Sequence, residues 1–176
     1  MSFSDPVNNI SQMDLQSGMK VADFGAGVGF YSFPLSKVIG DSGRVYAVEI
    51  QKDLIEKLKK DAHKMGVHNI DVIWGDVEHK GGVHLRDGFL DAVVVANVLF
   101  QVGDKKMMAE ETKRVLKSGG KLLLIDWLES FGGMGPHKDH VVTKRKALEI
   151  FEPVGFKVEK DVRAGAHHWG VLLRKI

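Results

Sequence analysis

Glycines and acids stand together near the start of this chain, in a pattern that can bind a polar ligand. Asp23 ends a short apolar run and is followed at once by Gly25, Gly27 and Gly29. Glycine lets a ligand approach the backbone closely, and the free N–H groups of a following helix attract polar or negative groups. A glycine-rich turn alone is a weak indication. Its place between a strand and a helix, directly after an acid, is what favours a binding loop.

Further polar residues recur at the same relative position in later segments. Glu49 ends the second apolar run, Asp76 follows the third and Asn97 follows the fourth. A carboxylate at Glu49 can accept hydrogen bonds from ribose hydroxyls, and Asp76 can accept one from the exocyclic amine of adenine. Each also has a structural explanation: a helix entry for Glu49, a turn for Asp76 and a cap for Asn97. Their joint succession at consecutive strand ends is what predicts a site.

Strand and helix patterns alternate along the chain and would bring these residues together. The expected strands are 19–24, 44–50, 70–74, 90–96, 121–127, 156–161 and 169–175, and the expected helices are 30–39, 53–65, 105–116 and 143–152. This alternation predicts an α/β three-layer sandwich with a mostly parallel, seven-stranded sheet. The last two strands have no helix between them and should form an antiparallel edge hairpin. Ligands bind outside the carboxyl ends of strands in such sheets.

Composition limits the function classes. At 176 residues and 44% hydrophobic, the chain is expected to form a short N-terminal segment (1–18) and one domain (19–176). A net charge of +2 argues against a dedicated nucleic-acid-binding face. The absence of cysteine excludes disulfides, thiolate metal sites and cysteine nucleophiles. Without a signal-peptide pattern or an apolar run of about 20 residues, a soluble, cytoplasmic protein is expected.

Five motifs stand in a diagnostic order: DFGAGVG, VYAVEI, WGD, LDAVVVANVLFQ and RVLKSGGKLLLIDW. In this order and spacing, the chain resembles the class I S-adenosylmethionine-dependent methyltransferases from about Met19 to its end. It is most similar to small members without a substrate cap, which carry a Met-Gly-Pro loop after the fifth strand, here Met134-Gly135-Pro136. The resemblance implies a Rossmann-like fold, a single methyltransferase domain and S-adenosylmethionine as cofactor.

The resemblance also implies a role for each motif. The acid–glycine loop would lie under the methionine part of the cofactor, Glu49 would bind the ribose hydroxyls, and Asp76 would meet the adenine amine. The residues implied to contact the cofactor are Asp23, Gly25, Ala26, Gly27, Gly29, Phe30, Glu49, Ile50, Asp76, Val77 and Asn97. Of these, Ile50 would pack beside the adenine, Val77 would offer a backbone contact, and Asn97 would face the amino-acid end.

A nicotinamide-dependent dehydrogenase is the main competing interpretation, since it shares the glycine turn and the ribose acid. Its fingerprint needs Gly-x-Gly-x-x-Gly, whereas here Gly29 is followed by Phe30. A carboxylate at Asp23 is also unfavourable near a pyrophosphate and suits a cationic cofactor better. A third interpretation is a non-catalytic, cofactor-binding partner subunit, which a titration with S-adenosylmethionine and a turnover assay would distinguish.

Methyl transfer requires alignment above all, and a general base only when the acceptor arrives protonated. The catalytic candidates are His137 and His140 after the fifth strand, and His168, beside His167, before the last. Histidine titrates near neutral pH, although loop histidines are often only surface residues. No metal site is expected, because His137 and His140 have no further ligands at suitable spacing.

A small-molecule acceptor is favoured, because no large insertion forms a substrate cap. A protein or RNA acceptor is the alternative, served by a basic cluster at Lys138, Lys144, Arg145 and Lys146, which otherwise is a solvated helix face. The lack of cysteine argues against arsenite chemistry. Neither a membrane nor a nucleic acid is an expected partner, and a homo-oligomer, with a partner subunit closing the cleft, stays open.

Overall fold

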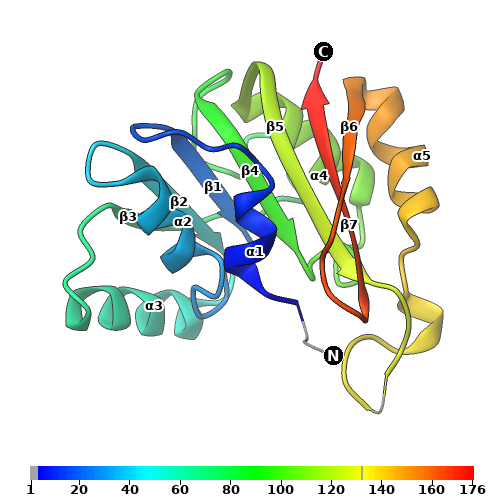
Figure 1. Ribbon diagram of the computed structural model, residues 1–176, viewed down its shortest axis with the longest axis horizontal. Helices are drawn as coiled ribbons and strands as arrows, with labels where there is room; N and C mark the ends of the chain where they lie inside the picture. The colour runs from blue at the N-terminus through cyan, green and yellow to red at the C-terminus, as the bar shows by residue number, and fades with distance from the viewer. Residues whose placement is uncertain (1–3, 132) are drawn as a thin grey trace.

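A seven-stranded sheet forms the middle layer of the computed structural model, which describes residues 4–131 and 133–176 (Figure 1). The strands are β1 (Lys20–Phe24), β2 (Arg44–Glu49), β3 (Ile70–Trp74), β4 (Leu90–Ala96), β5 (Leu116–Trp127), β6 (Phe156–Val162) and β7 (His168–Lys175). The helices are α1 (Pro6–Ser11), α2 (Ser32–Ile39), α3 (Lys52–Lys64), α4 (Lys105–Val115) and α5 (Lys144–Gly155), with a short 3-10 helix η1 (Lys138–His140).

The strand order is β3-β2-β1-β4-β5-β7-β6. The strands from β3 to β5 are parallel, and β7 pairs antiparallel with both β5 and β6. The predicted α/β, Rossmann-like class with an antiparallel C-terminal hairpin is therefore confirmed. The order reverses between β1 and β4, and a ligand site is expected outside the carboxyl ends of the strands at such a point.

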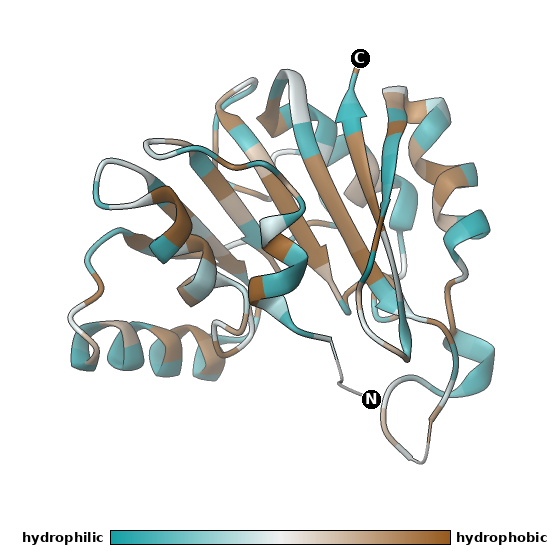
Figure 2. Ribbon diagram, in the orientation of Figure 1, coloured by the Kyte–Doolittle hydropathy of each residue, from teal (hydrophilic) through white to brown (hydrophobic). Residues whose placement is uncertain are grey.

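Both faces of the central strands are buried, which explains their continuous apolar runs. In β4, Val93 and Val95 pack in the cluster that includes α4 and α5, while Ala92 and Val94 pack with α1 and α2. Leu58 of α3 packs on the same side of the sheet as α2. Figure 2 shows the strands β4, β5 and β7 as largely hydrophobic, with hydrophilic residues along the outer helices. Burial on both faces thus holds the site-bearing strand ends in fixed relative positions.

Two boundaries differ from the sequence expectation by three residues or more, and the others agree to within two residues. Strand β5 begins at Leu116 instead of Lys121, because Leu116 already pairs with Leu90 and the register then shifts within the strand. The glycines after Ser118, expected to close a helix, form this irregularity. Helix α5 continues past Pro153 to Gly155 instead of ending at Glu152, since a proline in the last turn interrupts it little.

Helix α1 lies in the N-terminal segment for which no element was predicted. Asp5 caps it by accepting hydrogen bonds from the N–H groups of Val7 (3.0 Å) and Asn8 (3.4 Å). Ile10, only 1% exposed, packs into the core cluster of α2, and the Asn9 amide donates to the Tyr31 hydroxyl (2.8 Å). Over the described ranges 4–131 and 133–176, no helix has the length and apolar character needed to cross a membrane.

Replacing Ile10 with alanine tests whether α1 belongs to the folded unit. The change removes a buried side chain, so we expect the free energy of unfolding in urea to fall by about 2–5 kcal/mol. Val7→Ala on the same helix is the control, because Val7 is 63% exposed and its loss should have little effect. Equal stability of the Ile10 variant and the wild type would contradict the packing of α1.

Candidate functional site

The carboxyl ends of β1, β2, β3 and β4 meet at one edge of the sheet, around a pocket of about 290 Å³. Among the predicted site residues, the pocket is lined by Gly25, Gly27, Glu49, Ile50, Asp76, Val77 and Asn97. Residues from four separate segments of the chain thus converge where the strand order reverses. The structure brings together most of the binding residues that the sequence predicted.

The glycine loop lies against the end of β2. The N–H groups of Gly25 and Ala26 both donate to the carbonyl of Val48, at 2.9 and 3.0 Å. Gly25 has a φ of +70°, and a Cβ atom there would lie 2.6 Å from a methyl carbon of Val98. At Gly27, with a φ of +55°, a Cβ would meet only the Gly25 carbonyl, at 4.0 Å. The loop therefore presents bare backbone to the pocket at Gly27.

Three other loop residues lie outside the lining of this pocket. A Cβ atom at Gly29 would lie 2.5 Å from the Cδ1 atom of Leu58, so this glycine allows the loop to pack on α3. Ala26 is buried beside Leu58, and Phe30 is 62% exposed with its ring edge toward Tyr31. Cofactor contacts by Ala26, Gly29 and Phe30 stay predictions.

Three backbone N–H groups hold the carboxylate of Glu49. One oxygen accepts a hydrogen bond from the N–H of Gly27 (2.9 Å), and the other accepts from Ile50 and Gln51 (2.9 Å each). Glu49 is only 5% exposed but lines the pocket. Its orientation is thus set before a ligand arrives, and its remaining lone pairs can accept hydrogen bonds from a diol.

Asp23 lies beneath the glycine loop, not on the wall of the pocket. It is 3% exposed, and the Ser32 hydroxyl donates to its carboxylate at 2.6 Å. Burial raises the pKa of Asp23 to about 7; hydrogen bonds from Ser32 oppose this shift and the charge of Glu49 adds to it. The carboxyl is therefore poised to ionise near neutral pH, and a nearby cation would favour its charged form.

Asp76 and Asn97 reach the pocket from opposite sides. Asp76 accepts a hydrogen bond from the N–H of Glu78 (2.9 Å) and contacts His79 Nδ1 at 2.8 Å. Asn97 has a φ of +60°, and its carbonyl accepts from Gln101 Nε2 at 3.0 Å. In the described part of the chain, no donor pairs with the buried Oδ1 of Asn97. An unpaired buried acceptor costs about 1–3 kcal/mol.

The three catalytic candidates fall in different environments. His137 and His140 lie at the exposed helix η1, where Asp139 contacts His137 at 3.1 Å. His168 is 5% exposed at the start of β7, with its ring centroid 4.4 Å from that of Trp127. Burial and then His167 lower the pKa of His168, so its ring is neutral at neutral pH. Neither ring nitrogen of His168 has a hydrogen-bond partner among the described residues.

The loop after β5 packs on Trp127 and on His167. A Cβ atom at Gly135 would lie 2.7 Å from the ring of Trp127, so the predicted Met-Gly-Pro turn rests directly on this indole. Phe131 stacks on His167 with ring centroids 3.9 Å apart. The turn therefore lies on Trp127, the ring that His168 also contacts, while His137 and His140 follow it on the surface.

Sequence reasoning missed several lining residues, including Glu78, Val98, Gln101 and Val102. Their only signal in the sequence is that they lie close to Asp76 and Asn97. Side chains of these types are common in turns, so the residue types themselves indicate no site. Asp126, near the end of β5, is fully buried and accepts hydrogen bonds from the N–H groups of Trp127 (2.7 Å) and Phe100 (3.3 Å). Burial raises the pKa of Asp126 to about 6, against the effect of these hydrogen bonds.

The sequence pattern of a family described as a methyltransferase domain matches residues 15–152. The chain belongs to this family. The resemblance of the motifs to class I S-adenosylmethionine-dependent methyltransferases is thereby confirmed, and the dehydrogenase interpretation loses its support. This match does not test whether the chain is most similar to the small members with a Met-Gly-Pro loop.

Relatives with known names agree with this assignment. The chain is 31% identical over 114 residues to a ubiquinone/menaquinone biosynthesis C-methyltransferase, UbiE, of Haemophilus ducreyi, covering 64% of this chain and 43% of that protein. A crystal structure of a SAM dependent methyltransferase from Aquifex aeolicus superposes with a TM-score of 0.90 at 29% identity, over 99% of this chain and 91% of that one. The chain spans about half the length of the curated relatives that it matches.

The raised pKa of Asp23 predicts that binding of S-adenosylhomocysteine, which carries a cationic amino group, depends on pH. Ionised Asp23 favours the cation, so binding releases a proton from a carboxyl whose pKa is about 7 in the free protein. Affinity should rise as pH increases through this value, with a limiting slope of about tenfold per pH unit below it. Calorimetric titration from about pH 5.5 to about pH 8.5, a range that brackets the pKa of Asp23, measures the effect.

Asp23→Asn is the matched variant, because an amide fills the same space and does not titrate. Its affinity for S-adenosylhomocysteine should be lower above pH 7 and nearly independent of pH. A wild-type affinity that falls with rising pH, or an unchanged profile in the variant, would contradict the assignment.

Proposed function

We propose that this chain is an S-adenosylmethionine-dependent methyltransferase that transfers a methyl group in line to a small-molecule acceptor. The observation that carries the proposal is the pocket at the reversal of strand order, where Gly27, the fixed carboxylate of Glu49 and Asn97 converge. Membership of the methyltransferase domain family supports it.

The residues of the pocket fit the parts of this cofactor. Glu49 offers free lone pairs to the ribose hydroxyls, and the half-exposed Ile50, with Val77, offers apolar surface to the adenine. Asp76 offers an acceptor to the adenine amine. Asn97, on the pocket wall, offers an amide to the cationic amino group, and the buried carboxyl of Asp23 beneath the loop favours its positive charge.

Bound S-adenosylmethionine supplies an activated methyl group on a sulfonium, so the protein contributes binding and alignment above all. Glu49 and the glycine loop hold the adenosyl end through backbone-anchored groups that need little rearrangement. Alignment of this kind contributes up to about 7–11 kcal/mol in favourable systems. A base is needed only for an acceptor that arrives protonated.

Among the three candidates, we favour His168 as the base. It is neutral, buried and unpaired at both ring nitrogens, and it lies beside Trp127 at the end of β5. His137 and His140 are exposed, and an aspartate already contacts His137. A small acceptor fits this arrangement, because the connection between β4 and β5 contains only helix α4 and its turns.

A protein acceptor is the second candidate, and one relative favours it. The chain is 35% identical over 65 residues, 37% of this chain and 31% of that protein, to a protein-L-isoaspartate O-methyltransferase of Methanococcus maripaludis. Incubating the protein with methyl-labelled S-adenosylmethionine and separate small-molecule, protein and RNA fractions distinguishes the acceptor classes. Label in the small-molecule fraction alone supports the proposal, and label in protein or RNA overturns the acceptor assignment.

Glu49→Gln tests the cofactor site. The amide cannot accept from all three backbone N–H groups and from the ribose, and hydrogen bonds to charged groups contribute about 1.5–3 kcal/mol each. We expect the Kd for S-adenosylhomocysteine to rise by about tenfold or more. Asp53→Asn, on the exposed first turn of α3, is the control and should bind as the wild type does. Failure of the wild type to bind would refute the proposed function.

His168→Gln tests the base, using whichever acceptor takes the label. For an acceptor that must lose a proton, kcat should fall by about 10²–10⁴-fold while the Kd for S-adenosylhomocysteine is unchanged. Because the pKa of His168 is lowered, kcat of the wild type should decline only at pH values below the usual pKa of histidine. The His168→Gln variant should lack this decline with pH. His63→Gln on exposed α3 is the control, and an unaltered kcat in the His168 variant would exclude it as the base.

A further inference from the structure

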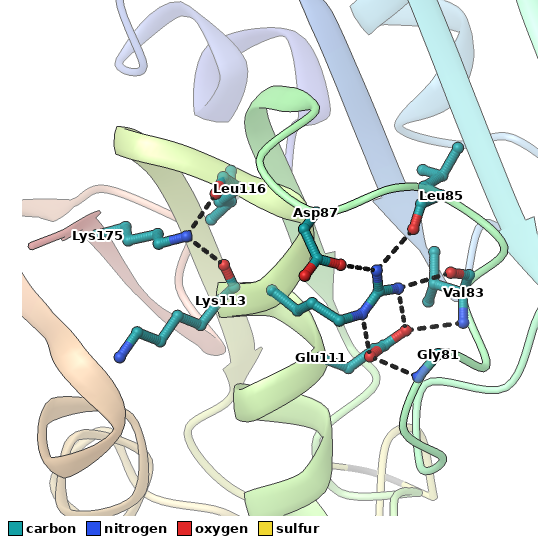
Figure 3. A network of polar contacts seen from close by, with 9 residues as sticks. Gly81, Val83, Leu85, Asp87, Glu111, Lys113, Leu116 and Lys175 are labelled. Carbon is teal, nitrogen blue, oxygen red and sulfur yellow. Dashed lines mark hydrogen bonds and ion pairs between the residues drawn. The ribbon is translucent and has the colours of Figure 1, made fainter.

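A buried ion pair on α4 reaches across to the chain that follows β3. Glu111 and Arg114 stand three residues apart on one side of the helix, with side chains 1% and 17% exposed. Figure 3 shows Glu111 beside the backbone of Gly81 and Val83, on the other side of the helix end from the contacts of Lys175. We call Glu111 and Arg114 the α4 clasp.

Every donor of the Arg114 guanidinium is used. Its Nε and Nη2 atoms donate to Glu111 at 2.8 and 2.7 Å, and Nη2 also donates to the carbonyl of Val83 at 2.8 Å. Nη1 donates to the carbonyl of Leu85 and to Asp87, both at 2.7 Å. Five donors in a rigid fork thus fix the path of residues 83–87 relative to the helix.

Glu111 completes the arrangement from the other side of the segment. Its carboxylate accepts hydrogen bonds from the N–H groups of Gly81 and Val83, both at 3.0 Å. Burial alone would raise the pKa of Glu111, but hydrogen bonds from Arg114, Gly81 and Val83 lower it below its usual value. The carboxylate is therefore charged at neutral pH and binds only this segment and its own helix.

The clasped segment is continuous with the adenine side of the pocket. The N–H of Asp76 donates to the carbonyl of Gly82 at 3.1 Å, and a Cβ atom at Gly82 would collide with the Asp76 carbonyl. At the other end of α4, Glu78 accepts a hydrogen bond from the N–H of Asp104 at 2.7 Å. Residues 75–83 are thus tied to α4 at both of its ends, with Asp76 and Val77 between the ties.

We infer that Glu111 and Arg114 are positioning residues of the cofactor site, which hold Asp76 and Val77 at the adenine. Buried ion pairs are often no more stabilising than apolar residues of similar volume, so stability alone gives no reason for this clasp. Apart from the carboxylate of Asp87, its partners are backbone groups of one segment, which an apolar side chain could not orient. The inference rests on the proposed function, because it takes the cofactor to be an adenosyl compound.

The role of the α4 clasp is tested by how strongly the protein prefers one purine over another. This preference is a sharper test than the affinity for S-adenosylhomocysteine alone. S-inosylhomocysteine carries an oxygen where S-adenosylhomocysteine carries the amine, so a well-placed Asp76 should prefer the adenosyl compound. In Glu111→Gln the isosteric amide cannot accept from all four donors, and the segment loosens. We expect the ratio of the two Kd values, measured by calorimetry, to fall by about tenfold in this variant, the scale of one hydrogen bond to a charged group.

Lys175→Met is the matched control, because it weakens the same helix without touching the segment. Lys175 donates to the carbonyls of Lys113 (2.7 Å) and Leu116 (2.6 Å) at the end of α4 (Figure 3). Its loss should lower thermal stability and leave the Kd ratio unchanged. Arg114→Lys keeps the positive charge but loses the forked guanidinium, so it should lower the Kd ratio as Glu111→Gln does. It replaces Glu111→Gln in the test if Glu111→Gln does not fold.

Asp76→Ala gives the ratio expected when the amine has no acceptor, and the Asp76→Ala/Glu111→Gln double variant should show no further fall. A wild-type ratio in Glu111→Gln, or an equal fall in Lys175→Met, would overturn the inference while leaving the proposed function intact. If the wild type binds neither compound, the proposed function fails, and the inference fails with it.

Discussion

Three backbone N–H groups bind one carboxylate, that of Glu49, and the geometry of the pocket depends on this interaction. Gly27 donates from the loop after β1, while Ile50 and Gln51 donate from the turn after β2. The side chain therefore joins two adjacent strand ends and sets the distance between them. A carboxylate held in this way needs no reorganisation to accept a diol, so the energy of ordering it is spent in folding and not in binding.

Electrostatics gives the two sides of this edge different characters. Under the glycine loop, burial raises the pKa of Asp23 to about 7, and the charge of Glu49 adds to this shift. This arrangement favours a ligand with a positive charge, because the cation compensates the ionised form. On the β5 side, His168 is held neutral against Trp127. One edge of the sheet thus combines a site for a cation with a neutral, aromatic neighbour.

Local patterns predicted most of the fold, because strands buried on both faces need continuous apolar runs and parallel strands need crossover helices. The predicted class and the antiparallel hairpin are confirmed, and Glu49, Asp76 and Asn97 indeed meet at one pocket. Boundaries set by long-range pairing were not predictable. Leu116 joins β5 only because Leu90 lies beside it, and α1 is held by packing against α2.

The sequence by itself determined which residue types stand at the strand ends, since these follow from local periodicity and glycine content. Only the tertiary structure decided what each one touches. Gly29 serves packing against Leu58, whereas Gly27 faces the pocket. Histidines that are equivalent in the sequence separate into the exposed pair on η1 and the buried His168. The contact of Glu111 with Gly81 joins residues far apart in the chain, and such contacts depend on how helices dock on the sheet, which no local pattern encodes.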